Sequence, residues 1–292
     1  MKIDIRYTMT APVSHIGETA STGAYFNMVK YGPDRLPVIT GNSIRGQIRD
    51  AGAAELLARL GTRVDKETFH VLFSGGNVST TMKDDVGRAQ AVREAFPLIS
   101  VLGGALGTMI MSGKMICGFA YPICREAIGI TGVDSSISWR DMIDEIEFTR
   151  TDDAKNDKLA AAHITDTDAV STGAASQQMR YAVQYMAAGT EFAQRIILLP
   201  GTGNAETGAL LAAIEHWWRT APRLGGMSGK GFGLFDAVLC FDDIPILRVS
   251  DGNVEVSELA YALINEYMDA SNYSAQYLPL LKGDSKNGKK AN

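Results

Sequence analysis

The first nine residues alternate in hydrophobicity with the two-residue period of a β-strand that buries one face. The apolar side chains on that face are Met1, Ile3, Ile5, Tyr7 and Met9. A strand of this kind needs a second layer of structure to cover its apolar face. The alternation therefore predicts a strand over residues 1–9 in a layered fold.

The next periodic segment changes to helical spacing. Apolar residues recur every three or four positions over residues 42–60, and Gly61 supplies a stop. The glycine turn before this segment brings Asn42 and Ser43 to the start of the helix, where either side chain can cap the free amides. We therefore predict a capped helix that covers the first strand.

Further elements follow the same two periods. Helices are predicted over residues 84–95, 206–220 and 257–270, and strands over residues 114–122, 191–199 and 232–241. Trp217 and Trp218 fall at helical spacing and are expected in the core. Together these elements predict an α+β fold, with helices packed against a mixed, largely antiparallel sheet.

Two stretches lack a clear period. Residues 11–39 are rich in Gly, Ser, Thr and Pro, which predicts long loops with one short extended piece at residues 36–39. Residues 96–113 are uncharged and nearly long enough to span a membrane, but Pro97 and four glycines interrupt them. We expect a buried strand and a glycine loop there, and no membrane span.

Changes in composition along the chain indicate how it is organised. Residues 146–190 are polar or small with few apolar anchors, which predicts an inserted hairpin. The lysine-rich end predicts a flexible tail over residues 271–292. The core then consists of residues 1–145 and 191–270.

Charge and cysteine content narrow the class of protein. The 292 residues carry a formal net charge of -5, which excludes a protein that is basic throughout but allows basic charge to gather in one groove. Three cysteines without Cys-x-x-Cys spacing argue against a disulfide framework or a four-ligand zinc site, and they favour the cytoplasm. The charged N-terminus does not resemble a signal peptide. The four histidines lack metal-ligand or triad spacing, so no metal, cofactor or catalytic residue is predicted.

Arg45 and Arg49 are four positions apart and share one face of the predicted helix. With the free amides after Gly41 they can form a phosphate site. The local charge supports this, since Lys30 and Arg35 precede the helix and Asp34 is the one acid between residues 27 and 49. Solvation of a helix face by the two arginines explains the same spacing equally well.

A second glycine cluster occupies residues 223–236, RLGGMSGKGFGLFD. A strand and no helix follows it, which argues against a dinucleotide site. Glycines allow a close approach of another backbone, and Lys230 would supply charge. A mobile loop before an edge strand is the alternative.

Three separated stretches resemble, in the same order, the RAMP superfamily of CRISPR-associated proteins. They are VITGNSIRGQIRD (38–50), QQMRYAVQYMAAGTEF (177–192) and GGMSGKGFGLF (225–235), and SHIGE (14–18) has a counterpart as well. The resemblance is closest to the backbone subunits of type IV complexes and next to those of type III. It implies an RRM-like (ferredoxin-like) core with an inserted thumb hairpin at residues 146–190, in a hand-like shape.

The resemblance also implies a function and a set of partners. Repeated copies of such a subunit coat the guide RNA (crRNA) and present it for pairing with target DNA or RNA, beside other CRISPR effector subunits. By their position in the resembling motifs, or by local charge, the following residues are expected to bind RNA: His15, Lys30, Gly41, Asn42, Ser43, Arg45, Gly46, Arg49, Gln178, Met179, Arg180, Gly226, Lys230 and Gly231.

The resemblance bears on catalysis too. Type III backbone subunits cut target RNA with an aspartate that precedes the glycine-helix signature, and this chain has Phe26 and Asn27 at the matching position. A subunit that binds without cutting is therefore expected. The alternative is a metal-dependent endoribonuclease that uses Asp34 or another loop acid, and a stand-alone metabolic enzyme is a third possibility.

Overall fold

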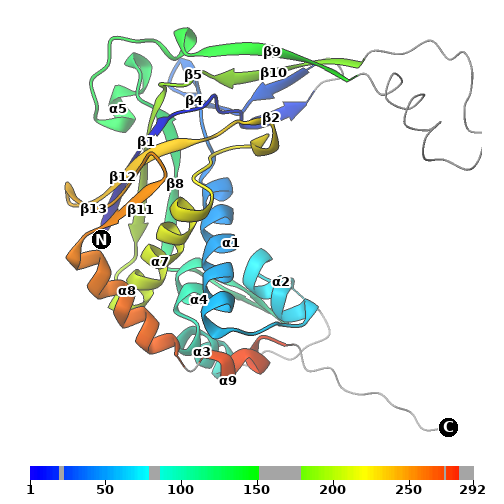
Figure 1. Ribbon diagram of the computed structural model, residues 1–292, viewed down its shortest axis with the longest axis vertical. Coiled ribbons are helices and arrows are strands. Elements are labelled where there is room, and N and C mark those ends of the chain that lie inside the picture. The colour runs from blue at the N-terminus through cyan, green and yellow to red at the C-terminus, as the bar shows by residue number, and fades with distance from the viewer. Residues whose placement is uncertain (20–22, 79–85, 151–178, 273, 283–292) are drawn as a thin grey trace, which may run out of the picture.

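A computed structural model describes residues 1–19, 23–78, 86–150, 179–272 and 274–282 of the chain (Figure 1). Its centre is a βαββαβ unit. In chain order the unit consists of β1 (Lys2–Met9), α1 (Gly41–Leu60), β8 (Met115–Pro122), β11 (Glu191–Leu198), α7 (Asn204–Thr220) and β12 (Phe235–Phe241). These six elements include most of the helices and strands that the sequence predicts.

The central sheet has the strand order β14-β13-β12-β1-β11-β8, and all neighbouring strands are antiparallel. The four strands of the βαββαβ unit therefore lie in the order 4-1-3-2, which is the order of ferredoxin-like and RRM folds. β13 (Ile244–Ser250) and β14 (Asn253–Val256) extend the sheet beyond β12. The predicted α+β class with an RRM-like core is confirmed.

Helices cover one face of this sheet (Figure 1). The alternating residues of β1 point into the main core, where Ile3 and Tyr7 are fully buried. α1 contributes Ile44 and Ile48 to the same core, and α7 contributes Trp218, as expected from its spacing. α8 (Glu258–Ser271) packs against α7. The apolar faces of the predicted strand and of the predicted helices therefore pack into one core.

A second hydrophobic core lies at the far end of α1. It is built by α2 (Lys66–Ser74), α3 (Val86–Ala95), α4 (Pro97–Leu102) and the hairpin of β6 (Gly104–Leu106) and β7 (Met109–Met111). The prediction of a buried strand and a glycine loop at residues 96–113 is wrong for the first half, where Pro97 starts a short buried helix that Gly103, at φ 70°, ends. The β6–β7 hairpin follows in the second half. Among the described residues, no helix is long and apolar enough to cross a membrane.

Part of the segment predicted as a flexible tail, residues 274–281, is helical. α9 (Ser274–Tyr277) and a 3₁₀ helix (Leu278–Leu281) pack against the second core, where Leu281 is 1 % exposed. Ser274 Oγ donates to the carbonyl of Ala95 at 2.7 Å. Apolar side chains late in the sequence hold this segment in place. Residues 283–292 lie outside the described part of the chain.

Residues 11–39 contain more structure than the predicted loops. They form β2 (Ile16–Thr19), β3 (Gly23–Phe26), β4 (Met28–Tyr31) and β5 (Asp34–Pro37). β4 pairs with β5, whereas β3 pairs in parallel with β10 (Met179–Met186). Such short strands give little local signal, and the partner of β3 lies far along the sequence.

β10 also pairs with β9 (Ile143–Arg150), and the second sheet has the order β2-β3-β10-β9. The antiparallel β9–β10 hairpin projects from one end of the body (Figure 1). An inserted hairpin is predicted at residues 146–190; β9 begins three residues before that segment, and β10 ends within it. Short helical turns precede β9: Arg125–Ala127, α5 (Ile128–Thr131) and Trp139–Asp141.

Candidate nucleic-acid interface

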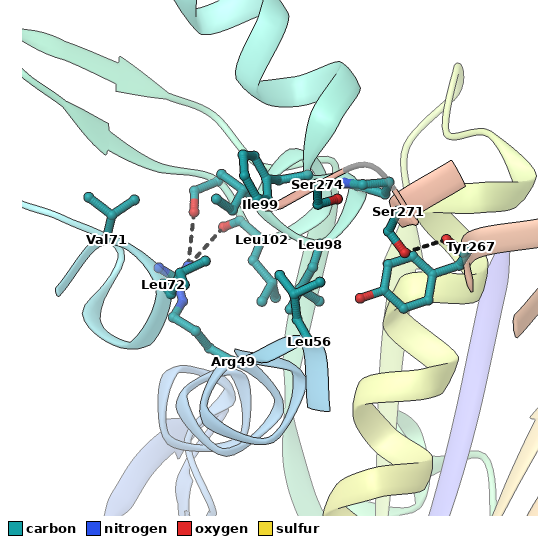
Figure 2. Close-up of a pocket in the computed structure, with 13 residues that line it drawn as sticks. Arg49, Leu56, Val71, Leu72, Leu98, Ile99, Leu102, Tyr267, Ser271 and Ser274 are labelled. Carbon is teal, nitrogen blue, oxygen red and sulfur yellow. Dashed lines mark hydrogen bonds between the residues drawn. The ribbon is translucent and has the colours of Figure 1, made fainter. Parts of the chain in front are cut away.

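Arg45 and Arg49 of α1 do not form the predicted phosphate cradle. Arg45 Nη2 donates to the carbonyl of Leu102. Arg49 Nη2 donates to the carbonyls of Leu102 (3.3 Å) and Gly103 (3.0 Å), and Figure 2 shows the Arg49 side chain reaching across from α1 to them. Both guanidinium groups therefore bind carbonyls at the end of α4.

Helix geometry explains this position of Arg49. The last carbonyls of a helix have no partner within the helix and carry partial negative charge, so a cation there is favourable. Arg49 also lies against Gly75, which caps the C-terminus of α2 and leaves room for the guanidinium. Burial, with a smaller effect of the Arg45 charge, lowers the pKa of Arg49. The Arg49 side chain thus connects α1 to the C-terminal ends of α2 and α4.

The first turn of α1 is capped by Thr40, and not by Asn42 or Ser43 as predicted. Thr40 Oγ1 accepts from the amide of Ser43 at 3.4 Å. The amide of Thr40 donates to His15 Nε2 at 3.2 Å, and the same nitrogen lies 3.0 Å from Thr40 Oγ1. His15 Nε2 can accept this hydrogen bond only when the imidazole is neutral. Burial lowers the pKa of His15 and so favours the neutral form. His15 therefore lies directly at the start of α1.

The glycine-rich loop meets the segment that carries His15. Gly226 donates to the carbonyl of Ser14 at 2.7 Å, and Ser14 Oγ donates to the carbonyl of Gln184 in β10 at 2.9 Å. Met227 adopts the left-handed conformation at φ 60°, which is unusual for a residue with a side chain. Residues 13–15, the first turn of α1, the glycine-rich loop and the near end of the β9–β10 hairpin thus meet at one place, which we call the junction.

Lys230 lies at the junction among aromatic rings. Its Nζ is 4.1 Å from the ring centre of Phe148 and 4.9 Å from that of Tyr181, and it contacts the Tyr181 hydroxyl. Phe148 and Tyr181 stack at 5.6 Å, with Phe232 at 6.3 Å from Phe148 and 6.1 Å from Tyr185. Among the described residues no carboxylate pairs with Lys230. An exposed cation beside stacked rings matches the way proteins bind single-stranded nucleic acids.

Sequence reasoning missed this aromatic cluster, because the rings come from three separate segments. Tyr181 and Tyr185 are four positions apart, so in a strand they lie on the same face. This spacing is the part of the cluster that the sequence could indicate. Phe148 is opposite Tyr181 in the register, so it lies on the same face. Sequence alone gave no indication that Phe232 would join them.

The other residues assigned to RNA have different locations. Met179 and Arg180 begin β10, and Gln178 lies outside the described residues. Gly46 is in the second turn of α1, where a methyl group would have no neighbour within 4 Å. Lys30 is exposed on the β4–β5 hairpin.

Asp34, the candidate catalytic acid, starts β5. One carboxylate oxygen, Oδ1, lies 3.5 Å from Arg140 Nη2, and both side chains are partly exposed. Within the described ranges, no group of three or more His, Cys, Asp or Glu side chains could hold a metal ion. The surroundings of Asp34 are thus those of a surface ion pair.

The face of the central sheet that the helices leave open forms a second candidate surface. A cleft of about 920 Å³ there is lined by Phe119 and Tyr121, whose ring centres are 6.2 Å apart. RRM proteins stack bases on aromatic side chains of this sheet. However, two acids, Asp4 and Asp243, line the same cleft and offset its two arginines, and Asp4 already neutralises Arg195 at 2.7 Å. This balance of charge favours an RNA strand less than the junction does.

Comparisons with known proteins agree with this architecture. No family model and no curated protein matches the chain. Among solved structures, the chain is similar to one from a structure described as a type IV-B CRISPR complex, with a TM-score of 0.59. The match has 17% sequence identity and covers 84% of this chain and 92% of that chain. The two chains therefore share a fold over most of their lengths.

Proposed function

We propose that the chain is a non-catalytic backbone subunit of a CRISPR effector complex, and that it holds guide RNA at the junction. The observation that carries this proposal is the meeting of four sequence stretches at one end of an RRM-like core. His15, Gln184 and Gly226 belong to three of these stretches, yet hydrogen bonds through Ser14 and Thr40 link them to one another and to α1. The fold shared with a chain of a type IV-B CRISPR complex supports the same function.

The chemistry of the junction suits a single-stranded RNA. Lys230 would bind a phosphate, and Phe148 and Tyr181 offer ring faces to a base. Neither contact depends on base identity, so base pairing would select the target DNA or RNA. Repeated copies of the chain along the guide, with other effector subunits at its ends, would complete a cytoplasmic ribonucleoprotein.

Salt dependence of RNA binding tests this proposal. Affinity of the wild type for a short guide RNA should fall steeply from low to high KCl, because each phosphate contact releases counterions. The variant Lys230→Gln should flatten the log-log slope by about 0.7, the value for one phosphate contact on a single strand. The control Arg63→Gln removes one charge near the other end of α1 and should keep the wild-type slope. Equal slopes for the two variants would remove Lys230 from the interface.

The endoribonuclease alternative has its own test. Assembled complex is incubated with Mg²⁺ and RNA complementary to the guide, and the products are sized. The proposal expects intact RNA. Evenly spaced cuts that Asp34→Ala abolishes would establish the endoribonuclease and overturn the non-catalytic assignment.

A further inference from the structure

The hairpin of β4 and β5 places two cations opposite each other. Lys30 and Arg35 are cross-strand partners in the register, and both are exposed. Among the described residues, neither side chain has a hydrogen-bond or ion-pair partner. Side chains in such positions have Cβ atoms about 5 Å apart, so like charges there repel and destabilise the hairpin.

Elsewhere the chain pairs opposite charges in the same geometry. Asp4 is opposite Arg195 in the central sheet, with 2.7 Å between their charged groups. Arg248 is opposite Glu255, at 3.9 Å. The pair on the β4–β5 hairpin departs from this pattern, and an anion between the two cations would remove the repulsion.

The hairpin emerges directly from the junction. Asn27, the residue before β4, donates to the carbonyl of His15 at 2.7 Å and accepts from the amide of Val38 at 2.9 Å. Lys30 is three residues further along an extended strand, which places it roughly 10 Å from that contact. An RNA strand held at the junction can therefore reach the outer face of the hairpin.

The hairpin is also fixed in place. At its tip the Tyr31 hydroxyl lies against α5, where Gly129 leaves room for it. Asp34 is cross-strand from Tyr31 and interacts with Arg140, so it does not neutralise the neighbouring cations. Cations held on a supported element lose little freedom when they bind a ligand.

We propose that Lys30 and Arg35 together bind one phosphate group of the RNA strand where it leaves the junction. The guanidinium can donate two parallel hydrogen bonds to a phosphate, and the lysine adds a point charge. This site rests on the proposed RNA-binding function. It deepens that function by adding Arg35, and it supplies the paired cations that Arg45 and Arg49 do not provide.

The test exchanges one repulsive partner for an attractive one. Arg35→Glu creates a cross-strand Lys–Glu pair, so we expect Tm to rise by about 1–2 °C. The same change should weaken binding of a short single-stranded RNA roughly tenfold at low salt and flatten the log-log salt slope by about 0.7. The matched control Arg63→Glu changes the net charge equally, past the other end of α1, a helix about 30 Å long. It should change neither Tm nor the slope appreciably.

The outcomes separate this site from the proposed function. If the wild type binds RNA with a steep slope and Arg35→Glu binds like Arg63→Glu, the phosphate site is wrong and the junction stands. If the wild type binds no RNA, both are wrong. An unchanged or lower Tm for Arg35→Glu would contradict the repulsion on which the site is argued. Should that variant fail to fold, Lys30→Gln, which only removes charge, must flatten the slope in its place.

Discussion

Replacing Gly41 by alanine should destabilise the fold, because β8 leaves no space for a methyl group. A Cβ at this position would lie 2.8 Å from the carbonyl oxygen of Gly118 and closer still to that of Cys117. Both neighbours are backbone atoms, and β8 is held there by two hydrogen bonds exchanged between Ile39 and Ala120, at 3.0 and 2.9 Å. Forcing a methyl group into such a contact costs about 1–3 kcal/mol of unfolding free energy.

Gly46 provides a matched control in the same helix. A methyl group there would have no neighbour within 4 Å, and alanine is about 0.5–1 kcal/mol more favourable than glycine inside a helix. Gly46→Ala should therefore stabilise the protein, and the two variants should differ by about 1.5–4 kcal/mol in urea unfolding. If Gly41→Ala is as stable as Gly46→Ala, then the close approach of α1 to β8 is wrong.

Three further predictions concern the arginine contacts, the histidine and the aromatic rings. Arg49→Met should cost about 1–3 kcal/mol in urea unfolding, because it leaves the buried carbonyl of Gly103 unpaired, while a wild-type RNA salt slope is retained; a flattened slope at full stability would restore Arg49 to the interface. His15 in its neutral form stabilises the fold fully above pH about 6.5, and this contribution is lost as the pH falls toward its lowered folded-state pKa, so Tm should decrease over that range in the wild type and much less in His15→Gln. Phe148→Leu should weaken RNA binding by about 1–3 kcal/mol, and Phe69→Leu on α2 should not; equal affinities would exclude stacking at the junction.

Local sequence patterns were enough to predict the main helices and strands of the core. They were not enough for short strands whose pairing partners lie far along the chain. The alternation in residues 1–9 and the helical spacing after Gly41 each reflect one buried face, so both elements could be predicted. Of the strands between residues 16 and 37, only the end of β5 falls in the predicted extended piece at residues 36–39. The others could not be predicted, because each has four residues and β3 depends on β10 for pairing. α4 was missed because its residues are all buried, and a short apolar segment of this kind has no period that separates strand from helix.

The candidate site shows the same limit. Spacing correctly placed Arg45 and Arg49 on one face of a helix, but it could not reveal that this face meets the carbonyls of Leu102 and Gly103. Thr40 caps the helix because its backbone is still extended and α1 begins at the next residue, Gly41. The predicted caps, Asn42 and Ser43, already lie inside the helix. The resemblance of the glycine-rich loop to a family motif predicted that this loop binds RNA. It gave no indication that Lys230 would lie against Phe148 and Tyr181.

Mapping protein–RNA crosslinks on the complex assembled with guide RNA tests the central claim most directly. The account predicts crosslinked peptides that contain His15, Phe148 or Lys230, all from the junction. Crosslinks confined to Phe119 and Tyr121 on the open face of the central sheet would contradict it and would move the RNA to the other side of the fold.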